Sequence, residues 1–105
     1  MSDEPRISID RDRIAEFCRK HGIVEFSLFG SVLRDDFGPS SDVDVLVKFD
    51  PSRKFGLFAF AGMELELAEM FGREVDLVDK VAVEQSKNPY RRRSILSSYS
   101  VLYAN

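Results

Sequence analysis

Paired acids open one of the apolar strands that this sequence predicts. Asp42 and Asp44 stand two positions apart at the start of the run DVDVLV, residues 42–47. Because strand side chains alternate between faces, both carboxylates project from the same face, a few Å apart. Like charges at this separation repel, and burying either one without compensation is costly. A divalent cation removes the repulsion, and ligands that are all oxygen favour Mg²⁺ or Mn²⁺.

A glycine and a serine end the preceding apolar run and suit a phosphate group. Gly30 follows the run IVEFSLF, and Ser31 comes directly after it. Glycine permits close backbone approach, and Ser31 offers both a hydroxyl and a helix N-terminal amide to phosphate oxygens. Protein-bound Mg²⁺ usually shares its coordination with substrate phosphates and water. The two features together suggest a metal ion that arrives with a nucleotide.

A third acid, Asp76, lies among the apolar residues of the segment REVDLV, residues 73–78. On a neighbouring strand it could converge on the first two acids, as a bridging ligand or as the acceptor of a proton from an attacking hydroxyl. Each feature also has a plain structural explanation: Asp42 and Asp44 as a polar strand entrance, Asp76 as a solvent-facing strand end, Ser31 as a helix cap. Their combination favours the metal site.

Hydrophobic periodicity and turn signals give the elements that must position these residues. Apolar residues at helical spacing and helix-ending glycines mark two long helices, and runs rich in β-branched residues mark three strands. The order predicts an α/β (α+β) fold with a small mixed β-sheet flanked by helices. The predicted elements are a helix over about 10–20, a strand over 23–29, a short helix over 31–34, a loop over 35–41, a strand over 42–49, a helix over about 56–71, a strand over 73–78 and a last helix from Asn88-Pro89 to about Tyr103.

Length and charge limit the class of protein. The chain has 105 residues, which we interpret as a single domain over residues 1–105. A net charge of −3 argues against direct nucleic-acid binding. The sequence shows no secretory leader and no apolar run near the roughly 20 residues that a membrane helix needs. With one cysteine, Cys18, the chain cannot form an internal disulfide, and we expect a cytoplasmic protein.

The spacing of the site residues resembles a known signature. Gly30-Ser31, ten intervening residues and Asp42-Val43-Asp44 are similar to the motif of the DNA polymerase β-like nucleotidyltransferase superfamily. The short chain resembles the minimal nucleotidyltransferases (MNT proteins) of that superfamily, from about Ile23 to Val78 and more weakly to Tyr103. One position departs from the pattern, because Asp35 follows Arg34 where many members have glycine.

The resemblance implies the polymerase β-like nucleotidyltransferase fold and a two-metal nucleotidyl transfer. Asp42 and Asp44 would hold two Mg²⁺ ions, and Asp76 would complete one site and help activate the acceptor hydroxyl. Gly30 and Ser31 would hold the triphosphate of ATP. Arg34 is a further nucleotide-binding candidate, with an ion pair to a neighbouring acid as its alternative role.

The resemblance also implies a partner. MNT proteins of this size pair with helical HEPN proteins as toxin–antitoxin couples. Some transfer AMP from ATP to a tyrosine of the HEPN toxin and thereby silence its RNase activity. A hetero-oligomer follows from that expectation. Two alternatives stay open: a non-catalytic antitoxin that neutralises the HEPN partner by stoichiometric binding, and nucleotidyl transfer to a small-molecule acceptor.

Several other residues carry weaker signals. We interpret His21, beside the Gly22 helix end, and Cys18, on an apolar helix face, as structural. The residues Tyr90, Tyr99 and Tyr103 are candidates for an exposed partner surface. The sequence assigns no role to Glu64, in the apolar stripe of the long helix, or to the basic run Arg91–Arg93.

Overall fold

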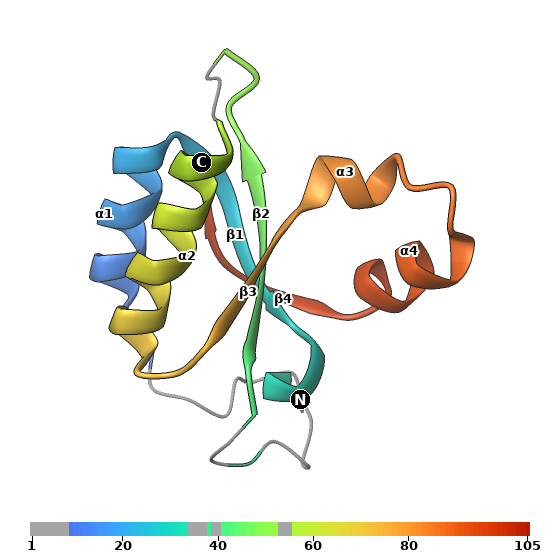
Figure 1. Ribbon diagram of the computed structural model, residues 1–105, viewed down its shortest axis with the longest axis horizontal. Helices are drawn as coiled ribbons and strands as arrows, with labels where there is room; N and C mark the ends of the chain where they lie inside the picture. Colours follow the sequence, from blue (N-terminus) through green and yellow to red (C-terminus); the bar gives the residue numbers. More distant parts are fainter. Residues whose placement is uncertain (1–8, 34–37, 39–40, 53–55) are drawn as a thin grey trace.

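A computed structural model describes residues 9–33, 38, 41–52 and 56–105. Helices and strands alternate in the first two thirds of the chain, as predicted, and a strand closes it (Figure 1). The elements are α1 (Arg11–His21), β1 (Ile23–Phe29), the 3₁₀ helix η1 (Gly30–Leu33), β2 (Val43–Phe49), α2 (Leu57–Phe71), β3 (Val75–Asp79), α3 (Lys80–Glu84), α4 (Pro89–Leu96) and β4 (Tyr99–Ala104).

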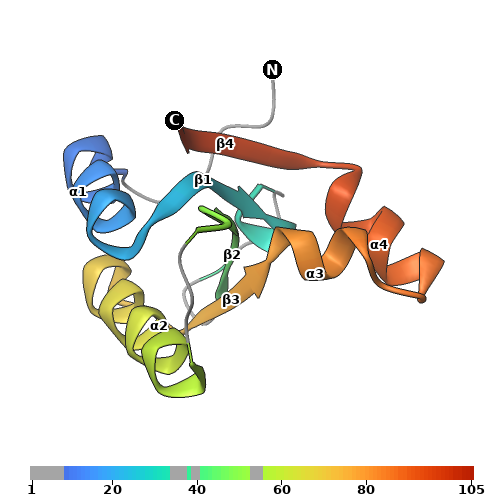
Figure 2. The same cartoon turned by 90° about the horizontal axis from the view of Figure 1, so that it is seen from above.

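The strands form one mixed sheet in the order β3-β2-β1-β4. Strand β1 is antiparallel to both β2 and β4, whereas β2 and β3 are parallel and are connected through α2. Helices α1 and α2 cover one face of the sheet, and α3 and α4 lie on the other side (Figures 1 and 2). The predicted class, a small mixed sheet flanked by helices, is confirmed.

The C-terminal part of the chain differs from the prediction. A single helix from residue 88 to about Tyr103 is wrong: α4 ends at Leu96, and β4 then pairs with β1. The Asn88 side chain caps the start of α4, as the sequence indicates, by accepting hydrogen bonds from the backbone amides of Tyr90 and Arg91. The short helix α3 is also missing from the prediction. The sheet therefore has four strands, with β3 and β4 at its edges.

The larger core lies between the sheet and helices α1 and α2. Val43, Val45 and Val47 of β2 are buried there, as predicted. Asp10 caps the start of helix α1, because its side chain accepts a hydrogen bond from the Arg13 amide, and Gly22 caps its end in the left-handed conformation. Cys18 is fully buried in this core, which confirms its structural role, and burial raises the pKa of its thiol to about 12.

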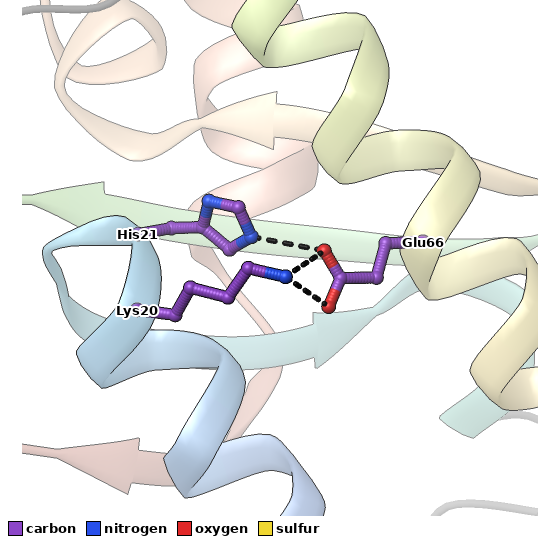
Figure 3. Close-up of polar contacts among 3 residues, drawn as sticks. All are labelled: Lys20, His21 and Glu66. Carbon is purple, nitrogen blue, oxygen red and sulfur yellow. Dashed lines mark hydrogen bonds and ion pairs between the residues drawn. The ribbon is translucent and has the colours of Figure 1, made fainter.

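A three-residue contact joins α1 to α2 at the surface of this layer (Figure 3). The Glu66 carboxylate of α2 lies 3.0 Å from Nε2 of His21 and 3.2 Å from Nζ of Lys20. Burial alone would raise the pKa of Glu66, but the hydrogen bonds and charges of His21 and Lys20 outweigh it and lower the pKa. The structural interpretation of His21 is confirmed, with Glu66 as its partner.

The opposite face of the sheet carries a smaller core. Phe29, Leu46 and Val78, from three neighbouring strands, pack there against Val83 of α3 and Ile95 of α4. This is the face that the acidic positions of β2 and β3 share, because side chains alternate along each strand. Among the described helices, none is both long and apolar enough to span a bilayer.

A buried lysine ties α3 to this face. Nζ of Lys80 donates hydrogen bonds to the Glu25 carboxylate of β1 at 2.8 Å and to the Tyr99 hydroxyl of β4 at 3.0 Å. It also lies 4.7 Å from the centroid of the Tyr99 ring. Tyr99 is thus engaged within the fold and Tyr103 packs against the larger core, whereas Tyr90 is 81% exposed. Of the three tyrosines, only Tyr90 has the exposure predicted for a partner surface.

Replacing Lys80 with methionine is expected to lower the free energy of unfolding by about 3 kcal/mol, because it leaves the Glu25 carboxylate half-buried without its counter-charge. Burial lowers the pKa of Lys80, but the Glu25 and Tyr99 contacts outweigh this and raise it above the ordinary value of 10.5. The charged contact therefore stabilises the fold fully below that ordinary pKa and is lost as pH rises through the folded-state pKa.

Urea unfolding of the wild type and the variant at neutral pH measures this difference. The double variant Lys80→Met/Glu25→Leu should recover part of the loss, because it removes both charges. Equal stabilities of wild type and Lys80→Met would contradict the assignment.

Candidate functional site

Two of the predicted acids face each other across neighbouring strands. The parallel register pairs Asp44 of β2 with Asp76 of β3, and residues in register share a face of the sheet. Asp42 directly precedes β2, two positions before Asp44. Asp42 and Asp76 are exposed and Asp44 is half-buried. The structure therefore brings all three acids to one end of the β2–β3 pair, with Asp44 and Asp76 as direct neighbours.

Gly30 lies against one of these carboxylates. Its φ of +76° is in the left-handed region that favours glycine. A Cβ atom built on Gly30 would overlap Oδ2 of Asp44 and would come within 3.2 Å of its Cγ. The backbone that leaves β1 thus approaches the acidic pair as closely as glycine allows. Ser31 follows in the backbone of η1, and Arg34 lies outside the described residues.

An arginine that the sequence did not single out holds the segment before Asp42. Nη1 of Arg73 donates hydrogen bonds to the carbonyl oxygens of Gly38 at 2.8 Å and Ser41 at 3.1 Å. The Gly38 amide donates to Oγ of Ser41, and the Ser41 amide donates to the Gly38 carbonyl. Val43 is fixed next to β3, because its amide donates to the Glu74 carbonyl at 2.9 Å. These bonds fix the backbone where the chain enters β2, and therefore the position of Asp42.

Glu64 has a structural role at the same strand. Its carboxylate accepts a hydrogen bond at 2.9 Å from the backbone amide of Leu77, the residue after Asp76. Strand β3 is an edge of the sheet, and edge strands carry backbone donors that need another partner. Glu64 supplies that partner from α2. It thereby holds the segment of β3 that carries Asp76.

The acids are suited to a magnesium ion that takes some of its ligands from the protein and the others from a substrate and water. Within the described ranges, no group of three or more histidine, cysteine and carboxylate side chains is assembled as a complete metal site. Mg²⁺ commonly binds one or two protein carboxylates and completes its shell with water and phosphate oxygens. The chain's one histidine and one cysteine both lie in α1, on the other side of the sheet. The donor set at Asp44 and Asp76 is therefore oxygen only, as Mg²⁺ and Mn²⁺ prefer.

Comparison with known proteins identifies the class to which this fold and site belong. The family model of the nucleotidyltransferase domain matches residues 11–102, which is most of the chain. The chain therefore belongs to the nucleotidyltransferase family, and the resemblance seen in the Gly30-Ser31 and Asp42-Val43-Asp44 motifs is confirmed.

Individual relatives within this family are similar to the chain in sequence or in fold. The protein adenylyltransferase MntA of Thermococcus cleftensis is 37% identical over 71 residues, covering 66% of this chain and 68% of MntA. A solved toxin–antitoxin structure with AMP-PNP superimposes with a TM-score of 0.70 at 20% identity, covering 92% of this chain and 75% of that chain. A chain in the complex of tri-AMPylated Shewanella oneidensis HEPN toxin with MNT antitoxin gives a TM-score of 0.58 at 20% identity, covering 90% and 70%. The two structures support the fold, and MntA is a homologue in sequence.

Proposed function

We propose that this protein is a Mg²⁺-dependent adenylyltransferase that transfers AMP from ATP to a tyrosine hydroxyl of a HEPN-domain partner. The observation that carries the proposal is the in-register pair Asp44–Asp76, with Gly30 packed against Asp44. It places a phosphate-compatible backbone beside two carboxylates on one sheet face. The names of the relatives support protein AMP transfer and a HEPN toxin partner, and the solved complex with AMP-PNP supports a nucleotide substrate.

The acidic residues would bind the metal, and the residues after β1 would bind the nucleotide. Asp42, Asp44 and Asp76 would hold Mg²⁺, or Mn²⁺ in its place, and the bound metal supplies positive charge to the attacking and leaving oxygens. Gly30 would bring its backbone close to the triphosphate, and Ser31 would donate its amide and hydroxyl to phosphate oxygens. Arg34 would contribute a further positive charge to the nucleotide.

The reaction is an in-line displacement at the α-phosphorus of ATP. Asp76 is exposed on the edge strand, and it would accept the proton of the acceptor hydroxyl. The acceptor oxygen forms a bond to the α-phosphorus as the bond to the bridging oxygen breaks, and pyrophosphate leaves. The products are an AMP-modified tyrosine and pyrophosphate. The proposal keeps the cytoplasmic location expected from the sequence, where ATP is abundant.

The test is transfer of labelled AMP. The protein is incubated with α-labelled ATP, Mg²⁺ and a candidate HEPN-domain partner, with the enzyme at about one fiftieth of the partner concentration. We expect label on most of the partner and loss of its RNase activity. EDTA should abolish both effects.

The same experiment separates the alternatives. Silencing of the partner only at equal concentrations, without label, would instead support neutralisation by stoichiometric binding. Label on an added aminoglycoside but on no protein would support a small-molecule acceptor. Either result would overturn protein AMP transfer.

A further inference from the structure

A pocket of about 320 Å³ opens beside Asp76, the register partner of Asp44. Its walls come from the second half of β3, from α3 and from the start of α4, which lie side by side on this side of the sheet (Figures 1 and 2). The volume is near the lower end of the roughly 300–1,000 Å³ typical of small-molecule sites. The pocket is therefore large enough for an aromatic side chain.

The pocket has an apolar wall and polar groups at its rim. Val78 and Val83 are buried, and Ala82 lies beside them at the surface. Arg91 of α4 and Asp76 of β3 add a positive and a negative side chain to the lining. An aromatic ring can pack on aliphatic side chains and place its face against a guanidinium. A phenol also carries the hydroxyl that the reaction requires.

The walls of the pocket are firmly positioned. Asp79 caps α3, since its carboxylate accepts a hydrogen bond from the Val81 amide at 3.0 Å. Nη1 of Arg92 donates to the Ser86 carbonyl at 2.6 Å and so connects α4 to the segment after α3. The Asn88 cap binds the Arg91 amide at 3.2 Å and fixes the backbone that carries the guanidinium. The pocket is therefore built into the fold around α3 and α4.

The order of groups across the sheet assigns a direction to the reaction. Gly30 after β1 packs on Asp44 of β2, and Asp76 of β3, which is in register with Asp44, lines the pocket. In an in-line displacement, the attacking and leaving oxygens stand on opposite sides of the phosphorus. If the pyrophosphate leaves on the Gly30 side, the attacking hydroxyl must approach from the Asp76 side.

We infer that the pocket beside Asp76 is the acceptor subsite, which takes the tyrosine ring of the partner protein and directs its hydroxyl at the Asp76 carboxylate. This inference rests on the proposed function, protein AMP transfer. It adds a binding site for the acceptor, and the apolar wall of that site explains why the acceptor side chain is aromatic. It also gives Arg91 a role at the rim of the subsite.

Filling the pocket tests the inference. Ala82→Phe places a ring in the pocket from an exposed position of α3. With the HEPN protein as acceptor, we expect KM for the acceptor to rise at least tenfold and KM for ATP to stay within twofold. Arg91→Ala should also raise the acceptor KM, and Arg91→Lys should restore part of it. The matched control is Ala59→Phe, at an exposed position of α2 on the other side of the sheet, which should change neither constant.

The outcomes separate this inference from the function on which it rests. An active wild type with unchanged acceptor KM in Ala82→Phe and Arg91→Ala would overturn the subsite and leave AMP transfer intact. A rise in KM for ATP alone would also overturn it and would place the nucleoside in the pocket. A wild type that modifies no protein would overturn the proposed function and the subsite together. Thermal unfolding of Ala82→Phe shows whether the variant is folded. The acceptor KM of Arg91→Ala tests the subsite independently if it is not.

Discussion

Replacing Asp44 with asparagine is expected to lower kcat for AMP transfer by about a thousandfold or more. Asp44 is the acid that contacts both other parts of the site, since it lies in register with Asp76 and against Gly30. Removing one fixed electrostatic group from an active site commonly costs about 10²–10³ in rate, and a metal ligand carries a full charge. Asp42→Asn should have an effect in the same direction.

The fold of the Asp44→Asn variant should survive. Asparagine has nearly the same shape, and the change removes the like-charge repulsion with Asp76, so stability without metal should be unchanged or slightly higher. Wild type should gain about 2.7 kcal/mol at 100 Kd of Mg²⁺ with a non-hydrolysable ATP analogue, and the variant should lose most of this gain at the same concentration.

The measurements are steady-state transfer to the HEPN protein and thermal unfolding with and without the analogue. The matched control is Asp12→Asn, an exposed acid in the first turn of α1 on the other side of the sheet, which should leave transfer unchanged. Full transfer activity in both Asp42→Asn and Asp44→Asn would refute the catalytic assignment.

The elements that the sequence predicted best are those with local signals. The Gly22 and Gly72 helix ends and the alternating valines of residues 43–47 specify α1, α2 and β2 without reference to the rest of the chain. Strand β4 is not specified by local signals. Its residues 99–104 follow an N-capped helix, and only pairing with β1, 70 or more positions earlier, determines that they are extended. A prediction from local signals therefore continued the helix.

The residues of the candidate site also fall into those that local sequence signals predict and those that they do not. The acids and Gly30 could be found because their spacing along strands places them together. The supporting residues could not, because each acts on a backbone group that the sequence does not mark. Arg73 binds carbonyls 35 and 32 positions earlier, and Glu64 binds an amide 13 positions later. The metal-ligand and nucleotide roles of the predicted residues, and the single-domain organisation, stay predictions that experiments must test.

Gly30 offers the second large effect, because one methyl group there acts on backbone and site together. A non-glycine residue at a φ of +76° carries about 1–2 kcal/mol of conformational cost. The new Cβ would also overlap Oδ2 of Asp44, so that carboxylate would have to shift. We expect Gly30→Ala to lower the free energy of unfolding by about 2–3 kcal/mol. Transfer should fall by about a hundredfold.

Gly72 provides the matched control for this variant. Its φ of +67° is nearly the same, but a Cβ there would meet no atom within 4 Å, and it ends α2 rather than lining the site. Gly72→Ala should therefore pay only the backbone cost, about 1 kcal/mol by urea unfolding, and should keep its kcat. The difference between the two variants isolates the contact with Asp44. Equal losses of stability with no loss of transfer in Gly30→Ala would mean that the approach of Gly30 to Asp44 serves the turn after β1 and not the chemistry.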